Sequence, residues 1–257
     1  MCYGTDARPP FPPIAGGAGA MRSEDVILEA SDGNRLLAFT AVSAASGAPG
    51  IVILPDVRGL HAFYRELAVR FAEAGVHATA MDYFGRTAGM GSRGEDFDHM
   101  PHVQQTTPET VAQDVAATAA HVRSPGGGGA TAIYTVGFCF GGRHSFNQAA
   151  GGHGLSGVIG FYGVPQQRDA HDAYAPMLRV GRYECPVLGL FGGSDKAIPL
   201  ESVERFRHAL DQADVPNEIV VYDGAPHSFF DRTADQHRDA SDDAWRRVLR
   251  FVGSSLS

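Results

Sequence analysis

Residues 137–142 read Gly-Phe-Cys-Phe-Gly-Gly, and they follow the apolar run Ala-Ile-Tyr-Thr-Val at residues 132–136. The apolar run predicts a buried strand. The glycine-rich stretch after it is typical of a sharp turn from a strand into a helix, which exposes one side chain, here that of Cys139, in a strained backbone conformation. Gly137 and Gly141 remove the Cβ atoms that would collide in such a turn. The stretch therefore predicts a nucleophile elbow that carries cysteine in place of the more usual serine.

The predicted position of Cys139 favours a reactive thiol. A thiol at a helix N-terminus lies at the positive end of the helix dipole, which favours the thiolate. Gly142 would let the helix pack closely on the sheet. The alternative is a glycine-rich turn around a buried structural cysteine, because short glycine-rich matches are common. Cys2 and Cys185 show neither metal spacing nor a paired framework, and Cys185, at a strand start, is expected to be a buried small hydrophobe.

Two further residues follow Cys139 in the order that an elbow-based triad requires, which is nucleophile, acid, base. Asp195 comes just after the predicted strand 187–191, and His227 lies in a loop after the predicted strand 218–222. His227 would accept the proton of Cys139, and Asp195 would hold the imidazole tautomer. Asp195 could instead be a turn residue, and His227 is one of 11 histidines and could be a surface group. Their order and their positions at strand ends favour the triad.

An oxyanion hole for this triad needs two backbone N–H donors. One is expected from Phe140, directly after the nucleophile. The other is expected from the loop 55–59, which follows the predicted strand 51–54, and Val57 is the candidate donor. Asp56 in the same loop would lie near the thiol, although it could equally be a loop or helix-capping carboxylate.

With these residues in place, the chain resembles the dienelactone hydrolase (carboxymethylenebutenolidase) family. The resemblance extends from about Val26 to Val252. Besides the elbow, it rests on Ala-Phe-Tyr-Arg-Glu at 62–66, Asp-Tyr-Phe-Gly-Arg at 82–86, Phe-Tyr-Gly-Val at 161–164, Gly-Gly-Ser-Asp at 192–195 and Gly-Ala-Pro-His-Ser-Phe at 224–229.

The resemblance implies that Cys139 is the nucleophile, His227 the base and Asp195 the orienting acid. Members of the family hydrolyse the enol-lactone ring of dienelactone to maleylacetate without a metal or an organic cofactor. The resemblance also implies a carboxylate beside the nucleophile that helps to convert the thiol to thiolate when substrate binds. That position is Asp56 here, where the family pattern has the longer glutamate.

The resemblance implies an anionic substrate, and Arg86 matches a family arginine that binds its carboxylate. A second arginine normally follows the catalytic histidine by four residues, but Asp231 stands there and Arg232 comes one residue later. Arg58, where the family pattern is aromatic, adds a cation near the oxyanion loop. Tyr162 is expected to form an aromatic wall of the pocket. Phe138 and Phe140 could do the same, although core packing is the better interpretation for Phe138.

Composition excludes several classes of function. The 257 residues fit one domain, and 44% of them are hydrophobic, which is enough for a substantial core. A formal net charge of −8 argues against nucleic acid and anionic membranes as partners. No apolar stretch is long enough to span a bilayer, and no secretory signal is evident at the N-terminus. A nucleophilic thiol must stay reduced, which favours a cytoplasmic location. The sequence does not indicate an oligomeric state.

The pattern of elements predicts a single-domain α/β-hydrolase fold over residues 21–257. Residues 1–20, rich in Pro, Gly and Ala, predict an extended or disordered arm. A hairpin at 26–30 and 36–42 would supply an antiparallel edge to a mostly parallel sheet with helices on both faces. Further strands are predicted at 51–54, 76–81, 131–136, 157–162, 187–191 and 217–222, and helices near 62–74, 108–123, 200–213 and 239–252.

The segment 85–107 is predicted to be a long polar loop at the substrate entrance. Asp96, Asp98, His99 and His102 lie in it and could in principle hold a metal. However, the predicted chemistry needs no metal, and such side chains in a polar loop are usually solvated, so no metal site is predicted.

Together these features predict a cysteine-dependent hydrolase of a small lactone or ester, working through an acyl-thioester on Cys139. One alternative is a carboxylesterase of the same family acting on a different ester. Another is a non-catalytic binding protein on a hydrolase fold, because a fold does not fix a function. The intact set of Cys139, Asp195 and His227 argues against the binding protein.

Overall fold

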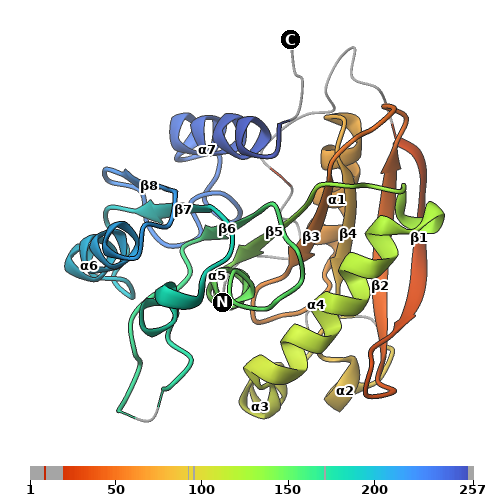
Figure 1. The fold of residues 1–257 in the computed structure, drawn as a ribbon, viewed down its shortest axis with the longest axis horizontal. Coiled ribbons are helices and arrows are strands. Elements are labelled where there is room, and N and C mark those ends of the chain that lie inside the picture. The colour runs from red at the N-terminus through yellow and green to blue at the C-terminus, as the bar shows by residue number, and fades with distance from the viewer. Residues whose placement is uncertain (1–8, 10–19, 92, 95, 171, 254–257) are drawn as a thin grey trace.

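The structure is a computed structural model that describes residue 9 and residues 20–253 except 92, 95 and 171. The predicted arm at residues 1–20 lies almost entirely outside the described residues. The described part forms one eight-stranded sheet in the order β1-β2-β4-β3-β5-β6-β7-β8, as Figure 1 shows. The strands are β1 (Ala20–Glu29), β2 (Arg35–Ser43), β3 (Gly50–Leu54), β4 (His77–Met81), β5 (Ile133–Phe138), β6 (Gly157–Phe161), β7 (Val187–Gly192) and β8 (Asn217–Tyr222).

The sheet is parallel from β4 to β8 and has an antiparallel edge formed by β1 and β2. This confirms the predicted α/β-hydrolase architecture. The one marked difference is β1, which begins six residues before the predicted Val26 and pairs along β2 from Glu29 to Ala20. Strands β3 and β5 are buried almost throughout, as is typical of parallel strands covered on both faces.

Helices cover both faces of the sheet. Phe71 of α1 and Trp245 of α7 pack with their ring centroids 4.8 Å apart on one face. On the other face α4 contacts α5. The ring centroids of Phe146 in α5 and Phe206 in α6 lie 5.1 Å apart there. The helices are α1 (Ala62–Glu73), α2 (Gly85–Ala88), α3 (Met100–Gln105), α4 (Pro108–Arg123), α5 (Phe140–Gln148), α6 (Leu200–Gln212) and α7 (Arg238–Phe251), with short 3₁₀ turns at Pro125–Gly127, Pro176–Leu178 and Val180–Arg182.

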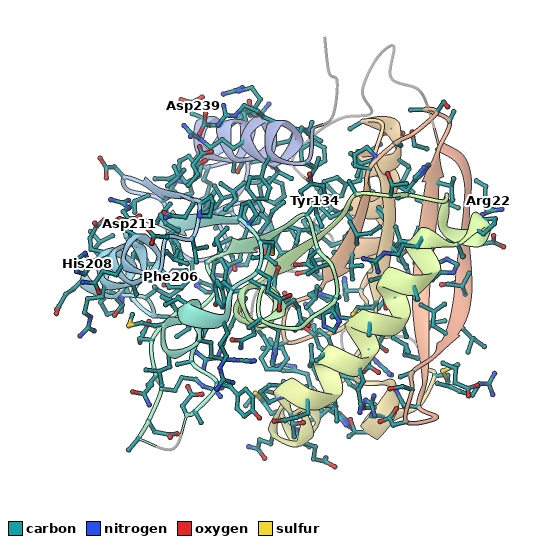
Figure 2. All side chains as sticks on the ribbon, viewed as in Figure 1. Arg22, Tyr134, Phe206, His208, Asp211 and Asp239 are labelled. Atoms are coloured by element: carbon teal, nitrogen blue, oxygen red, sulfur yellow. The ribbon has the colours of Figure 1, made fainter. Side chains whose placement is uncertain are left out.

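The α6 helix illustrates how the sequence pattern decides burial. Phe206 is fully buried, while His208 and Asp211 are exposed on the solvent side of the same helix (Figure 2). The alternation follows the helical period of 3.6 residues. No helix among the described residues is long and apolar enough to cross a membrane.

The predicted loop 85–107 is in fact interrupted by the helices α2 and α3. The sequence pattern does not reveal either helix, because each is too short to show a helical period. Aromatic contacts, which the sequence pattern does not reveal, hold the segment down: the ring of Phe97 stacks on His102 at 5.1 Å and lies 5.9 Å from Phe84.

Candidate active site

Cys139 occupies a sharp turn between β5 and α5, with φ 55° and ψ −111°. Few non-glycine residues adopt a positive φ, and such strain is typical of functional sites. A Cβ atom on Gly137 would lie 2.0 Å from the carbonyl oxygen of Gly141, and one on Gly141 would lie 2.2 Å from the carbonyl oxygen of Leu54. Both positions therefore require glycine, and the sharp turn from strand to helix that the sequence predicts is present.

The elbow is also fixed to the neighbouring strand β6. The Cys139 amide donates to the Phe161 carbonyl at 3.0 Å. A Cβ atom on Gly142 would lie 2.5 Å from the same carbonyl oxygen, so glycine at 142 permits the close packing that the sequence predicts. The Cys139 side chain remains partly accessible, whereas Phe138 is 1% exposed and stacks on Phe161 at 4.8 Å. Phe138 is thus a core residue.

Asp195 and His227 approach each other from the loops after β7 and β8. Nδ1 of His227 lies 2.6 Å from Oδ2 of Asp195, and the Asp195 side chain is only 1% exposed. The other carboxylate oxygen of Asp195 accepts a hydrogen bond from the Ala197 amide at 2.8 Å. Between the loops, the Ser194 amide donates to the Ala225 carbonyl at 2.9 Å. Asp195 is therefore held as an acceptor for the histidine, as expected from the sequence.

Cys139 also acts on His227 and is one of the groups that raise its pKa. Burial alone would lower the pKa of His227, but the hydrogen bonds to Asp195 and Cys139, with the negative charges of both partners, outweigh it and raise the pKa to about 10. An imidazole with this pKa is protonated at neutral pH. The arrangement therefore favours the protonated form of His227.

The loop after β3 lies against the start of α5, because the Leu54 and Pro55 carbonyl oxygens are the closest neighbours of Gly141. The fully buried Asp56 accepts a hydrogen bond from the Arg58 amide at 2.8 Å through Oδ1. Its backbone amide donates to the hydroxyl of Tyr64 at 3.1 Å. Val57 follows Asp56 in this loop, so Val57 and Phe140, the first residue of α5, come from segments in contact.

Tyr162 follows β6 and also has a positive φ, of 38°. Its ring centroid lies 4.9 Å from that of His227. Its hydroxyl group donates to Oδ2 of Asp231 at 2.9 Å. Tyr162 is fully buried, so it supports the histidine and Asp231 from within the core.

Asp231 is a buried acid that sequence reasoning noted only as a departure from the family pattern. It is 4% exposed, and its Oδ1 accepts a hydrogen bond from the Arg232 amide. Burial raises the pKa of Asp231, the negative charges of Asp56 and Cys139 raise it further, and the result is about 8 despite its two hydrogen bonds. The available signal in the sequence was an acidic residue directly after Phe229 and Phe230.

Arg86 is paired with acidic side chains of neighbouring segments. Its guanidinium group donates to both carboxylate oxygens of Asp114, at 3.1 and 2.7 Å, and to Asp32. It also reaches Gln113. The side chain thus joins α2 to α4 and to the β1–β2 turn. The bidentate face of its guanidinium group is thus paired within the protein, and the contact of Arg86 with a substrate carboxylate stays a prediction.

Arg58 is 8% exposed, and its positive charge acts on His61. Burial lowers the pKa of His61, and the charge of Arg58 lowers it further, to about 4. Arg58 is thus a buried cation near the oxyanion loop, and its contact with substrate stays a prediction.

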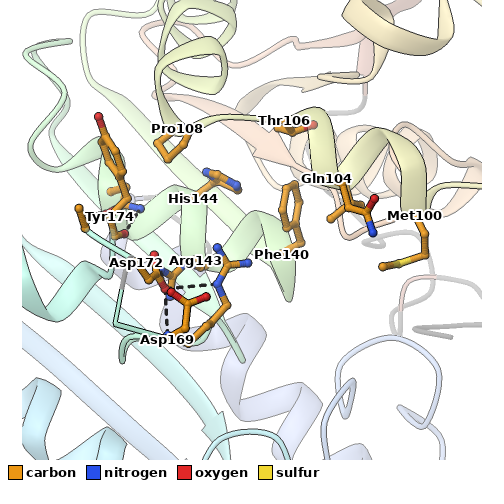
Figure 3. Close-up of a pocket in the computed structure, with 14 residues that line it drawn as sticks. Met100, Gln104, Thr106, Pro108, Phe140, Arg143, His144, Asp169, Asp172 and Tyr174 are labelled. Atoms are coloured by element: carbon orange, nitrogen blue, oxygen red, sulfur yellow. Dashed lines mark hydrogen bonds and ion pairs between the residues drawn. The ribbon is translucent and has the colours of Figure 1, made fainter.

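A cavity of about 500 Å³ lies next to Phe140, on the outer side of α5 (Figure 3). His144, 5% exposed, lines it and meets the Phe140 ring edge-on at 4.5 Å. The Arg143 guanidinium group at its base is paired with Asp172 at 2.6 Å. The other lining residues are Met100, Val103, Gln104, Thr106, Pro108, Asn147, Arg168, Asp169, Ala173 and Tyr174.

No group of three or more His, Cys, Asp or Glu residues within the described part of the chain could hold a metal ion. Arg93, in the segment that carries the acidic and histidine side chains, pairs with the buried Asp82 at 2.8 Å and lies over the Phe97 ring. The segment's observed interactions are therefore structural.

Comparison with known proteins identifies the family. The family model described as "Dienelactone hydrolase family" matches residues 36–256. A Salmonella typhimurium protein and an Escherichia coli protein, both named "Putative carboxymethylenebutenolidase", are 32% and 30% identical over 229 residues, which cover 86% of this chain and 83% of each relative. A solved Klebsiella pneumoniae structure named "Putative Dienelactone Hydrolase" is 27% identical, with a TM-score of 0.79 over 90% of this chain and 98% of that one. The elbow, the order of its partners and these matches agree, and the chain belongs to the dienelactone hydrolase family.

Proposed function

We propose that this hydrolase cleaves small esters or lactones through an acyl-thioester on Cys139. The observation that supports the proposal most strongly is the hydrogen bond between His227 and Asp195, together with the effect of Cys139, at the strained elbow, on the pKa of the same imidazole. A nucleophile, a base and an orienting acid in contact are the requirement for covalent catalysis of acyl transfer.

In the first half of the reaction, the Cys139 thiolate attacks the carbonyl carbon, and the carbonyl electron pair moves onto oxygen. When the tetrahedral intermediate collapses, the bond to the leaving oxygen breaks, and the His227 imidazolium donates its proton to that oxygen. In a lactone the leaving oxygen stays attached to the acyl group. In the second half, neutral His227 removes a proton from water, the hydroxide attacks the thioester, and the acid and the thiolate are released.

The negative oxygen of each intermediate requires donors that are already in place. We assign this role to the backbone N–H groups of Phe140 and Val57. The loop that carries Val57 is fixed by the hydroxyl groups of Tyr64 and Tyr83, which bond the backbone of Asp56 at 3.1 and 2.5 Å. A rigid loop keeps the donor in position without reorganisation during the reaction.

Asp56 is proposed to control the charge of the thiol. Support comes from Asp231, because the charges of Asp56 and of Cys139 both raise its pKa. A carboxylate close to Cys139 opposes formation of a second negative charge. Displacement of Asp56 when substrate binds would therefore favour the thiolate.

Two classes of substrate are proposed. A dienelactone-like enol-lactone is the first candidate from the family, and a carboxylesterase for another ester is the second. The expectation of an anionic substrate with Arg86 as its ligand stays a prediction, and in the structure Arg86 pairs with Asp114 and Asp32. We also propose a cytoplasmic location, because a reactive thiol persists in a reducing compartment.

The experiment that tests this function is selective alkylation. Iodoacetamide at pH 8 is expected to modify Cys139 and to abolish hydrolysis of 4-nitrophenyl acetate in parallel. Cys185 is 6% exposed, and burial raises its pKa to about 11, so its thiol should stay unreacted. A Cys185→Ala variant serves as the control, and iodoacetamide should inactivate it at the same rate as the wild type. Activity that survives complete modification of Cys139 would contradict the proposal.

A further inference from the structure

The cavity of about 500 Å³ on the outer side of α5 is a site of its own, because Phe140 lines it and Cys139 does not. Its volume is within the range of small-molecule sites. We propose that the cavity binds a small uncharged phenol, whose hydroxyl group donates a hydrogen bond to Asn147 and accepts one from His144. Binding there needs no step of the reaction proposed for Cys139, so the inference goes beyond the proposed function.

The helix α5 contributes Phe140, His144 and Asn147 to the wall of the cavity. Residues three or four positions apart lie on the same face of a helix, and Figure 3 shows His144 beside Phe140. The side chains of His144 and Asn147 are buried. Nδ1 of His144 and Oδ1 of Asn147 have no hydrogen-bond partner among the residues that the structure describes. Burial of a polar atom without a partner is unfavourable, so both atoms favour a ligand that supplies one.

The two side chains require a group that both donates and accepts. Nδ2 of Asn147 donates to the Tyr174 carbonyl at 3.0 Å, which fixes the amide group, and the amide oxygen can only accept. Burial lowers the pKa of His144, and the charge of Arg143 lowers it further, to about 3. The neutral ring therefore carries one N–H donor and one acceptor nitrogen. A hydroxyl group matches this pair.

The charged side chains of the wall are paired with one another. Arg143 lies 2.6 Å from Asp172 and donates to two backbone carbonyl oxygens at 2.9 Å. Arg168 lies 3.3 Å from the same carboxylate. Asp169 also lines the cavity, so the formal charges of the two arginines and two aspartates cancel. An ionic ligand would lose water without gaining a net opposite charge, and the site therefore favours an uncharged ligand.

The rest of the wall favours a flat apolar body. Val103 and Pro108 line the cavity together with the ring of Phe140. Met100 and Tyr174, also in the wall, are 49% and 36% exposed, although apolar side chains of this size are usually buried. An aromatic ring buries a large apolar area and packs favourably against other rings in edge-on or offset contacts. An aromatic ring that carries one hydroxyl group is a phenol.

The first test compares three ligands of similar size by NMR titration of the isotope-labelled protein at pH 7. 4-Methylphenol has the ring and the hydroxyl group, 4-methylanisole has no hydrogen to donate, and 4-hydroxybenzoate carries a negative charge. 4-Methylphenol should bind saturably and shift the amide signals of residues 140–147. The dissociation constants of the other two should be at least about tenfold higher, a loss of the order of one hydrogen bond. Failure of 4-methylphenol to bind saturably, or equal binding of the three ligands, would overturn the inference.

The second test changes the wall. Asn147→Leu removes the acceptor and should raise the dissociation constant of 4-methylphenol about tenfold. Gln105→Leu, at an exposed position of α3 that does not line the cavity, is the matched control and should bind like the wild type. Because Asn147→Leu also loses the bond to Tyr174, a further variant blocks the cavity from outside. Ala173→Trp, at an exposed position of the wall, should abolish binding, and Ala44→Trp, exposed between β2 and β3, should not.

Wild-type binding by Ala173→Trp, or an equal loss in Ala173→Trp and Ala44→Trp, would overturn the inference. Cys139→Ala separates this result from the proposed function. The variant should bind 4-methylphenol as the wild type does, whatever its effect on ester hydrolysis, because Cys139 does not line the cavity. Loss of 4-methylphenol binding in Cys139→Ala would place the phenol at the thiol and overturn the inference, even if Cys139 proves to be the nucleophile.

Discussion

Nδ1 of His227 lies 2.6 Å from Oδ2 of Asp195, and this contact joins the loops that follow β7 and β8. The bond occupies Nδ1 and leaves the opposite ring nitrogen, Nε2, for the proposed proton transfer. It also explains why His227 is strongly basic despite burial. The roles of the remaining site residues depend on this orientation of the ring.

Asp195→Asn is expected to reduce kcat for 4-nitrophenyl acetate by roughly 10⁴-fold, as in the serine triad, because the amide would favour the wrong imidazole tautomer. The exposed Asp223, after β8, provides the control, and Asp223→Asn should stay near the wild-type rate. The measurement is steady-state kinetics at pH 7.5. A loss below about tenfold would show that Asp195 does not orient the base.

Asp56→Asn is expected to change how a bound substrate analogue affects the thiol. In the wild type, a competitive inhibitor at the acyl site should speed modification of Cys139 by a small disulfide such as methyl methanethiosulfonate, because displacement of Asp56 removes a negative charge from the thiol's surroundings. In Asp56→Asn the reagent should react at one rate with and without the analogue. Identical profiles for the two proteins would show that Asp56 does not control the thiol.

Arg86→Ala is expected to cost stability and not substrate recognition. The substitution leaves Asp114, whose side chain is 1% exposed, without its cation, and breaking such a pair costs about 3 kcal/mol. Urea unfolding should therefore show a lower midpoint. Arg238→Ala, which removes an exposed ion pair with Asp235, should change the midpoint little. A selective loss of kcat/KM on 4-nitrophenyl hydrogen adipate, which carries a carboxylate, with the neutral methyl ester of the same compound unaffected, would identify Arg86 as a substrate ligand.

His144 should make the protein sensitive to acid. Burial lowers the pKa of His144, and the charge of Arg143 lowers it further, to about 3. The unfolded state therefore binds more protons than the folded state between about pH 6.5 and pH 3, so stability falls as the pH falls through this range. Between pH 6.5 and 5 the loss due to this residue should be roughly 2 kcal/mol.

The measurement for His144 is the free energy of urea unfolding at the two pH values. His144→Phe should remove most of the pH-dependent loss of stability that is due to His144. Phenylalanine fits the edge-on contact with Phe140, and it does not titrate. His208→Phe, at an exposed position, should leave the loss unchanged. The same pH dependence in His144→Phe and the wild type would mean that His144 is protonated in the folded state.

The elbow could be predicted from the sequence because the turn requires glycines at fixed positions within a short stretch of the chain. Gly137, Gly141 and Gly142 lie within six residues of one another, and each is required by a backbone atom that a Cβ would meet. The order of Asp195 and His227 was equally accessible, since each follows a strand whose apolar pattern is clear. The family resemblance supported the same residues.

What the sequence could not predict depends on long-range contacts. Arg86 meets Asp32 and Asp114, which lie 54 and 28 residues away, so its pairing is invisible in the local motif. The pKa of Asp231 is raised only because the fold buries its carboxyl group and brings the charges of Asp56 and Cys139 to act on it. The helices α2 and α3 were missed because 4 and 6 residues are too few for a recognisable period.

The most direct test of the central claim is to trap the acyl-thioester. Acid quench during turnover of 4-nitrophenyl acetate, followed by mass spectrometry of the peptide that contains residues 137–142, should show an acetyl group on Cys139 that disappears when the substrate is exhausted. Cys139→Ala should lose at least about 10³-fold in kcat and show no adduct. Wild-type hydrolysis by Cys139→Ala, or turnover with the Cys139 peptide unmodified throughout, would contradict the account.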